Sequence, residues 1–180
     1  NTQLEKDVFK TLNSHAINAK QYIKQPSEGS LKRYNAYNQW AVNTAKDVIK
    51  TMNERGSNQK YLLTVNLGAV DTAGHYRGVD GYLKTIEGID EIILSIYDLC
   101  LQNELALIMT ADHGMAFKPD GEHGGHKSDR YSTTEEAQKI PFIVASSGIK
   151  ETAIDGQFGQ EDIAPTILDI AGIAVPEIMD

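Results

Sequence analysis

Apolar residues along this chain recur either at helical spacing or in short continuous runs, a pattern typical of an α/β protein. From about Tyr37 to Arg55, apolar side chains recur every three or four residues and predict an amphipathic helix. A second such helix is expected from about Gly81 to Leu101, where isoleucines dominate one face. A weaker pattern over residues 1–24 predicts one or two surface helices, and a short helix is expected over residues 161–171.

Three short runs of apolar and β-branched residues predict strands, over residues 61–67, 105–111 and 140–146. The first two runs are nearly continuous, as in strands that are covered on both faces of a parallel sheet. With the helix between them they predict a strand, helix, strand unit with a right-handed crossover. Residues 114–138 are rich in glycine, charge and histidine, show little periodicity, and predict a long functional loop.

The size of the chain favours one domain with a core of its own. We expect 180 residues to form a single α/β domain, with a helical segment over residues 1–58 and a sheet core over residues 59–180. Breaker residues at 25–30 and 56–58 predict loops around the helix that lies between them.

Composition excludes some classes of partner. The chain carries 17 basic and 25 acidic residues, a net charge of −8, which disfavours binding to nucleic-acid polymers through their phosphates. Cys100 is the only cysteine, so an internal disulfide cannot form. No apolar run reaches the roughly 18 residues that a transmembrane helix needs, so no membrane-spanning segment is expected.

Four of the five histidines fall within residues 75–126 and predict a divalent-metal site. Asp112 and His113 follow a predicted strand, and α/β folds place their chemistry at the carboxyl ends of strands. Taken alone, this pair fits a helix cap and a polar loop residue about as well as two metal ligands. Carboxylates and imidazoles together suit zinc, manganese or iron.

Two further pairs surround this dipeptide. Asp71 and His75 lie four residues apart, so a helical turn would place both side chains on one face. Alone, that pair fits an Asx-turn with a surface histidine better than a ligand pair. His123 and His126 flank two glycines, whose flexible backbone suits a loop that closes over a site. Together, two aspartates and four histidines near strand ends favour a metal site.

Several motifs resemble the C-terminal half of the alkaline phosphatase superfamily, and they occur in that family's order. Within the superfamily, the nearest likeness is to type I phosphodiesterases and nucleotide pyrophosphatases and to the ethanolamine phosphate transferases of glycolipid-anchor synthesis. The motifs are residues 70–78 (VDTAGHYRG), 110–115 (TADHGM), 122–125 (EHGG), 132–136 (STTEE), 140–144 (IPFIV) and 162–172 (DIAPTILDIAG). The resemblance implies an alkaline phosphatase-like fold, with a mostly parallel sheet and helices on both faces.

The resemblance also implies ligands for two divalent ions, zinc first and manganese as the alternative. It makes Asp71, His75 and His123 the ligands of one ion, and Asp112 with His113 ligands of the second. Such enzymes hold two ions about 4 Å apart around a transferring phosphoryl group. The remaining groups of interest are candidate substrate contacts with a plain loop role as the alternative: His126, Arg77 and Lys127.

One part of the family pattern is missing. The family carries its Ser or Thr nucleophile and a further metal-binding aspartate after a strand in the N-terminal half. Residues 1–60 show no strand that leads into such a pair, so no nucleophile is identified. We therefore expect the nucleophile-bearing N-terminal half to be supplied by a longer parent or by another chain.

The leading functional hypothesis is a portion of a phosphodiesterase-like phosphoesterase or phosphotransferase that acts on a phosphate ester. A sulfatase or a phosphoglycerate-mutase-type enzyme of the same superfamily is the enzymatic alternative. A metal-stabilised binding domain without catalysis is the alternative from another class, favoured by the missing nucleophile. An extracytoplasmic or membrane-associated location is implied by the resemblance alone.

Overall fold

A computed structural model describes residues 2–24, 30–55, 59–156 and 158–179. The loops expected at 25–29 and 56–58 lie outside these ranges. Five α-helices, four strands and two short 3₁₀ turns make up the described part. In chain order they are α1 Gln3–Lys24, α2 Leu31–Glu54, α3 Ala69–Gln102, β1 Leu107–Thr110, β2 Ala116–Phe117, β3 Gly124–Gly125, α4 Glu135–Gln138, β4 Phe142–Ala145, the turn Gln160–Asp162, α5 Ile163–Ile170 and the turn Glu177–Met179.

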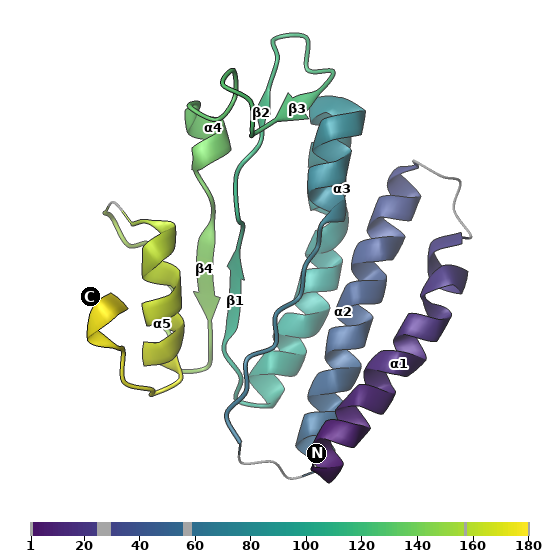
Figure 1. Ribbon diagram of the computed structural model, residues 1–180, viewed down its shortest axis with the longest axis vertical. Coiled ribbons are helices and arrows are strands. Elements are labelled where there is room, and N and C mark those ends of the chain that lie inside the picture. Colours follow the sequence, from purple (N-terminus) through teal and green to yellow (C-terminus); the bar gives the residue numbers. More distant parts are fainter. Residues whose placement is uncertain (1, 25–29, 56–58, 157, 180) are drawn as a thin grey trace.

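The three long helices lie side by side on one flank of the β1–β4 ladder, in the order α3, α2, α1 outward from the strands, while α5 lies on the other flank (Figure 1). The β2–β3 hairpin and α4 sit at the end of the molecule where α3 begins (Figure 1). Because β1 runs toward this same end, its last residues arrive beside the first turns of α3. This arrangement brings the predicted site residues of both elements together.

The hydrophobic core lies between α2 and α3. Its members are buried aliphatic or thiol side chains: Val42, Ala45, Ile49, Ile92, Ile96 and Cys100. Burial raises the pKa of the Cys100 thiol, which stays a neutral, apolar core group. The expected division into a helical segment and a sheet core stays a prediction, although α2 shares this core with α3.

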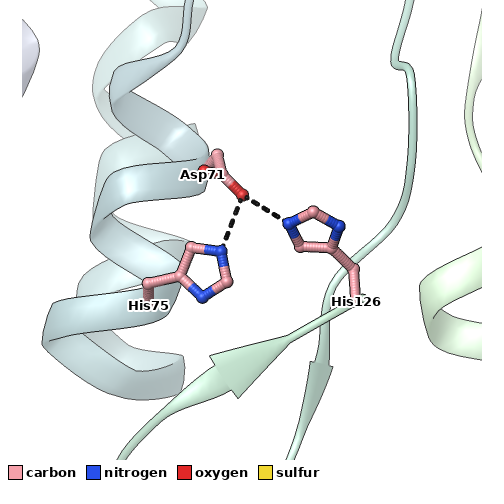
Figure 2. A group of neighbouring side chains, drawn as sticks. All are labelled: Asp71, His75 and His126. Carbon is pink, nitrogen blue, oxygen red and sulfur yellow. Dashed lines mark ion pairs between the residues drawn. The ribbon is translucent and has the colours of Figure 1, made fainter. Parts of the chain in front are cut away.

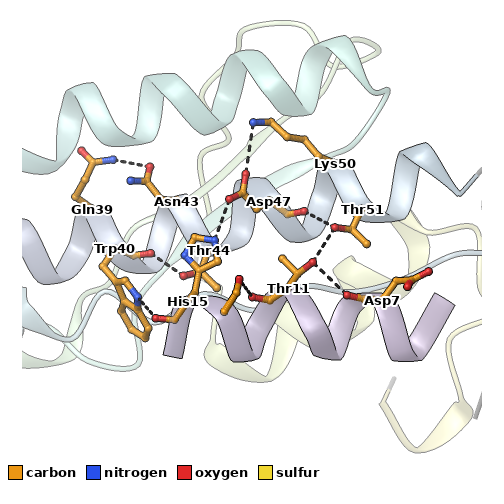
Figure 3. A network of polar contacts seen from close by, with 11 residues as sticks. Asp7, Thr11, His15, Gln39, Trp40, Asn43, Thr44, Asp47, Lys50 and Thr51 are labelled. Atoms are coloured by element: carbon orange, nitrogen blue, oxygen red, sulfur yellow. Dashed lines mark hydrogen bonds and ion pairs between the residues drawn. The ribbon is translucent and has the colours of Figure 1, made fainter. Parts of the chain in front are cut away.

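Polar contacts join α1 to α2 along their shared face (Figure 3). His15 Nε2 lies 2.9 Å from Asp47 Oδ2, and the Thr11 and Thr51 hydroxyls lie 3.0 Å apart. The Trp40 indole N–H donates to the backbone oxygen of His15 at 3.1 Å. Hydrogen bonds are directional, so these contacts help to fix how α1 docks on α2, where few apolar side chains are buried.

The prediction of a strand over residues 61–67 is wrong. These residues are extended but form no strand ladder, and their exposure alternates along the segment. Leu63, Val65 and Leu67 pack on the helical core, whereas Leu62 is 70% exposed. Only one face is therefore covered, which is why a run that reads as continuously apolar behaves as a half-buried segment.

The strand pairing also differs from the expected parallel arrangement. The ladders among the described residues are antiparallel, with β1 against β4 and β2 against β3. The chain turns through the hairpin and α4 at the end where β1 stops, so β4 must run back along β1. Residues 140–146 contribute the strand β4 as expected.

The helix expected from Gly81 begins earlier, at Ala69, and is kinked at Gly78. Gly78 has φ 64°, a conformation that glycine adopts without strain. A Cβ on Gly78 would lie 2.2 Å from the Gly121 carbonyl oxygen, which accepts a hydrogen bond from Val79 N–H at 2.9 Å. The kink thus fastens the first turns of α3 to the loop between β2 and β3.

Candidate metal centre

Three separate elements deliver the candidate ligands. Asp71 and His75 come from the first turns of α3, where a spacing of four places them on one helical face. His113 follows the end of β1, and His126 follows β3. Figure 2 shows His75 and His126 directed at the same carboxylate of Asp71. Residues 71–75 therefore form the helical turn on which the predicted pairing of Asp71 with His75 depended.

One oxygen of Asp71 is the centre of the cluster. Its Oδ1 lies 3.2 Å from His75 Nε2, 3.4 Å from His126 Nε2 and 3.8 Å from His113 Nε2. Two ligand atoms held about 2.1 Å from one tetrahedral ion lie roughly 3.4 Å apart, so these separations fit a shared ion. Asp71 Oδ1 is also buried and accepts no hydrogen bond. A bound cation is one group that satisfies a buried acceptor without a donor.

The hydrogen bonds on the far side of two rings strengthen this conclusion. His75 Nδ1 lies 2.9 Å from the Gly124 carbonyl oxygen, and His113 Nδ1 lies 2.8 Å from the Gly114 carbonyl oxygen. A carbonyl only accepts, so each Nδ1 carries a hydrogen, and in the neutral ring the lone pair then lies on Nε2, which faces Asp71. Imidazole lone pairs that converge on a carboxylate in this way form a set that can bind a cation.

His126 is the most buried of these histidines, with a side chain 6% exposed. Burial lowers the pKa of His126, the nearby imidazole of His113 lowers it further, and Asp71 opposes the shift. The low pKa favours the neutral ring, which is the form that binds metals. The family resemblance assigned no ligand role to His126, although the histidine pattern included it in the predicted metal site.

Asp112 and His113, the predicted ligands of a second ion, lie just after the end of β1. Asp112 Oδ1 lies 3.6 Å from His113 Nε2, and the Asp112 side chain is 90% exposed. The backbone oxygen of Asp112 accepts a hydrogen bond from Gln160 at 2.5 Å, which ties the strand end to the turn before α5. Within the described ranges, the one group of three possible ligands is Asp71, His75 and His126, so a second ion would need further donors.

His123 lies outside the Asp71 cluster. Its side chain is exposed, and its Nδ1 donates to the backbone oxygen of His75 at 3.0 Å. In an extended segment, residues three apart point to opposite faces, so only one of His123 and His126 can face the cluster. From sequence, that rule could have shown that only one of the two histidines faces the cluster, but not which one. The assignment of His123 as a ligand stays a prediction that this geometry does not favour.

Arg77 and Lys127 are both exposed. Within the described residues, neither forms an ion pair, although the charge of Lys127 lowers the pKa of His126. Their role as substrate contacts stays a prediction.

Close packing at glycines holds the helix against the hairpin. Met115 is buried and lies between Gly74 of α3 and Gly124 of β3. A Cβ would lie 2.8 Å from the Met115 side chain at Gly74 and 2.6 Å from it at Gly124. Gly74 lies between the two ligands of α3, so this contact sets the distance between Asp71 and the hairpin.

The sequence profile of the metalloenzyme superfamily matches residues 2–175. The chain belongs to the metalloenzyme superfamily. Its resemblance to alkaline phosphatase-like proteins, its fold class and its kinship with metal-dependent enzymes are therefore confirmed. Membership implies divalent metals, and the cluster around Asp71 provides ligands that fit one.

Similar proteins include several 2,3-bisphosphoglycerate-independent phosphoglycerate mutases. The one from Ehrlichia canis is 32% identical over 145 residues, which is 79% of this chain and 28% of that protein. The one from Onchocerca volvulus is 29% identical over 144 residues, which is 77% of this chain and 26% of that protein. The chain thus spans about a quarter of the length of these relatives. No solved structure matches the chain.

The leading hypothesis from the sequence was a phosphodiesterase-like enzyme. These relatives instead favour the phosphotransferases of the superfamily.

In the described part of the chain, every helix is too short or too polar to cross a membrane.

Proposed function

We propose that this chain is the metal-binding portion of a phosphotransferase of the phosphoglycerate-mutase type, acting on a phosphate ester. The observation that carries the proposal is the buried Asp71 Oδ1, faced by imidazole nitrogens of His75, His113 and His126 and lacking a hydrogen-bond donor. The similarity to phosphoglycerate mutases supports the choice among the reactions of the superfamily.

Within this proposal Asp71, His75 and His126 hold one divalent ion, and Asp112 with His113 contribute to a second. Bound ions would supply positive charge to a transferring phosphoryl group and lower the pKa of an attacking hydroxyl. The chain's own contribution is orientation: the carbonyls of Gly124 and Gly114 keep the hydrogens of His75 and His113 on Nδ1. Imidazoles with carboxylates suit both manganese and zinc, so both are candidates.

The hydroxyls of the N-terminal helices support a nucleophile supplied from elsewhere in the protein. Ser14 donates to the backbone oxygen of Thr11 at 2.8 Å, and Thr44 donates to that of Trp40 at 2.8 Å. Both hydroxyls are thus engaged within their own helices. This observation also favours the second candidate, a metal-stabilised binding domain without catalysis. A sulfatase and an extracytoplasmic location stay predictions that no observation here favours.

Metal analysis of the purified chain tests the site. We expect stoichiometric manganese or zinc in the native chain, loss of that metal in Asp71→Ala, and full retention in Asp98→Ala, which removes an exposed carboxylate of the same helix. A native chain that binds neither metal would sink the proposal.

Assays on the chain and on a longer protein that contains it test the reaction. We expect the longer protein to interconvert phosphoglycerates with metal present, and to act poorly on a chromogenic phosphodiester. If the longer protein binds metal but is inert toward both substrates, the binding-domain candidate replaces the enzyme.

A further inference from the structure

A surface cavity of about 320 Å³ lies against the β2–β3 hairpin. Its walls include two cations, two hydroxyl-bearing side chains, one carboxylate and one buried thioether. The residues that carry the argument are Lys118, Arg130, Tyr131, Thr134, Glu136 and Met115. None of them belongs to the metal-ligand set.

The two cations of this cavity lack acidic partners. Among residues with a described position, no carboxylate lies within 4.0 Å of the Lys118 ammonium or the Arg130 guanidinium, whereas Lys50, Arg55 and Lys139 elsewhere all have such partners. Glu136 is the one acidic group in the lining, so the cavity carries a net positive charge. In a chain with a net charge of −8, such a local excess is an attractive place for an anion.

Local contacts hold part of the remaining wall, although the Arg130 side chain is exposed. The Arg130 guanidinium lies 5.9 Å from the centre of the Tyr131 ring, close enough for cation–π attraction to help hold it. Thr134 accepts from Ala137 N–H and donates to the Tyr131 carbonyl, which fixes the backbone between Arg130 and Glu136. A guanidinium held in place can bind a phosphate or carboxylate through two parallel hydrogen bonds.

The cavity and the metal cluster share structural elements. A Cβ on Gly125, the residue before His126, would lie 2.4 Å from the ring of Tyr131. Met115 lines the cavity and also packs against Gly74, between Asp71 and His75. A ligand in the cavity would therefore lie one layer of side chains away from the metal ligands.

We propose that this cavity is an anion-binding subsite, in which Lys118 and Arg130 take a phosphate or carboxylate group. Its assignment to the non-reacting end of the phosphate-ester substrate rests on the function proposed above, whereas anion binding itself does not. Binding energy gathered at such a remote group would orient the ester over the metals. The net field of the chain opposes anions, so a local cationic pocket gives the selectivity that the overall charge cannot.

The test is a titration of the chain with inorganic phosphate and, separately, with glycerate, followed by amide chemical shifts in NMR. It is run on metal-loaded and on chelator-treated protein. We expect saturable shifts at Lys118, Arg130 and Thr134 in the loaded protein, with affinity reduced at least about tenfold in Lys118→Gln/Arg130→Gln. The anion that binds more tightly identifies the preferred group.

The matched control is Lys84→Gln/Lys150→Gln, which removes the same charge from exposed lysines outside the cavity. The control should bind like the native chain. Equal weakening in both double variants, or shifts that survive Lys118→Gln/Arg130→Gln, would overturn the subsite. Chelator-treated protein that keeps its dispersed spectrum should show the same shifts. A chain that binds phosphate here but no metal would reject the proposed function and keep the subsite.

Discussion

The imidazole rings of His113 and His126 lie parallel, with centroids 3.4 Å apart and planes 9° from each other. Two charged rings at this separation would repel strongly, so the stack requires that at least one of them be neutral. Both rings also direct Nε2 toward Asp71, at 3.8 and 3.4 Å. Stacking and convergence together favour neutral imidazoles around Asp71, and the neutral ring is the form that binds a metal ion.

The stability of the metal-free chain should fall as the pH is lowered. The pKa of His126 is lowered in the folded protein by burial and by His113, so below pH about 6.5 the unfolded chain binds more protons at this residue than the folded one. Stability from this group is present above about pH 6.5 and is lost as pH falls through the lower folded-state pKa. Thermal unfolding of the chelator-treated chain between pH 8 and pH 5 measures this.

The variant His126→Gln tests the cause of that slope. Glutamine does not titrate, so its stability should depend less on pH in the same window. An unchanged slope would show that His126 is not the group responsible.

Metal affinity should distinguish the two histidines of the hairpin. His126→Ala removes a nitrogen that lies 3.4 Å from Asp71 Oδ1, and we expect a loss of affinity well beyond 100-fold. His123→Ala removes a hydrogen bond to the backbone of His75, an orienting contact whose loss should weaken affinity by about 10-fold to 100-fold. Competition with a chromogenic chelator measures both constants.

Rescue separates orientation from ligation. His123→Asn keeps a donor for the His75 carbonyl and should recover affinity relative to His123→Ala, whereas a direct ligand would not be restored in this way. A larger loss for His123→Ala than for His126→Ala would return His123 to the ligand set that the sequence motif implied.

Much of the candidate site could be predicted from the sequence because the candidate ligands lie on elements with strong local signals. The spacing of Asp71 and His75 needed only a helical turn, and Asp112 with His113 needed only a strand before them. The choice between His123 and His126 depended on the direction of β3, a two-residue strand inside a segment with little periodicity. A glycine-rich hairpin of this kind is determined by packing, here by Met115 on Gly124, which no local pattern reveals.

The fold was predictable to the level of helices and less so for strands. The long amphipathic helices α2 and α3 carry their own period, and both were expected. Strand partners depend on how the chain returns, and α4, which sets the direction of β4, is only four residues long. Burial on one face or two cannot be distinguished in a short apolar run, which is why residues 61–67 were expected to lie inside a sheet.

The kink of α3 should be sensitive to substitution. Gly78→Ala places a Cβ against the Gly121 carbonyl and forces a non-glycine residue to φ 64°, so we expect a loss of about 1–3 kcal/mol or more in the free energy of unfolding. Gly148→Ala is the matched control, because its Cβ would meet no atom within 4 Å. Urea denaturation of both variants gives the comparison, and equal stabilities would show that the kink is not under steric constraint.

The one-sided burial of residues 61–67 predicts a contrast between neighbours. Leu63 packs on the core of α2 and α3, so Leu63→Ala should lower the free energy of unfolding by about 2 kcal/mol, less than for a fully buried leucine. Leu62→Ala removes a side chain that is 70% exposed and should change it by less than about 0.5 kcal/mol. If Leu62→Ala proves as damaging as Leu63→Ala, both faces of the segment are covered in solution, as in the parallel sheet that the sequence pattern predicts. The partner that covers the second face would then have to come from a further strand, because α2 and α3 already occupy the first.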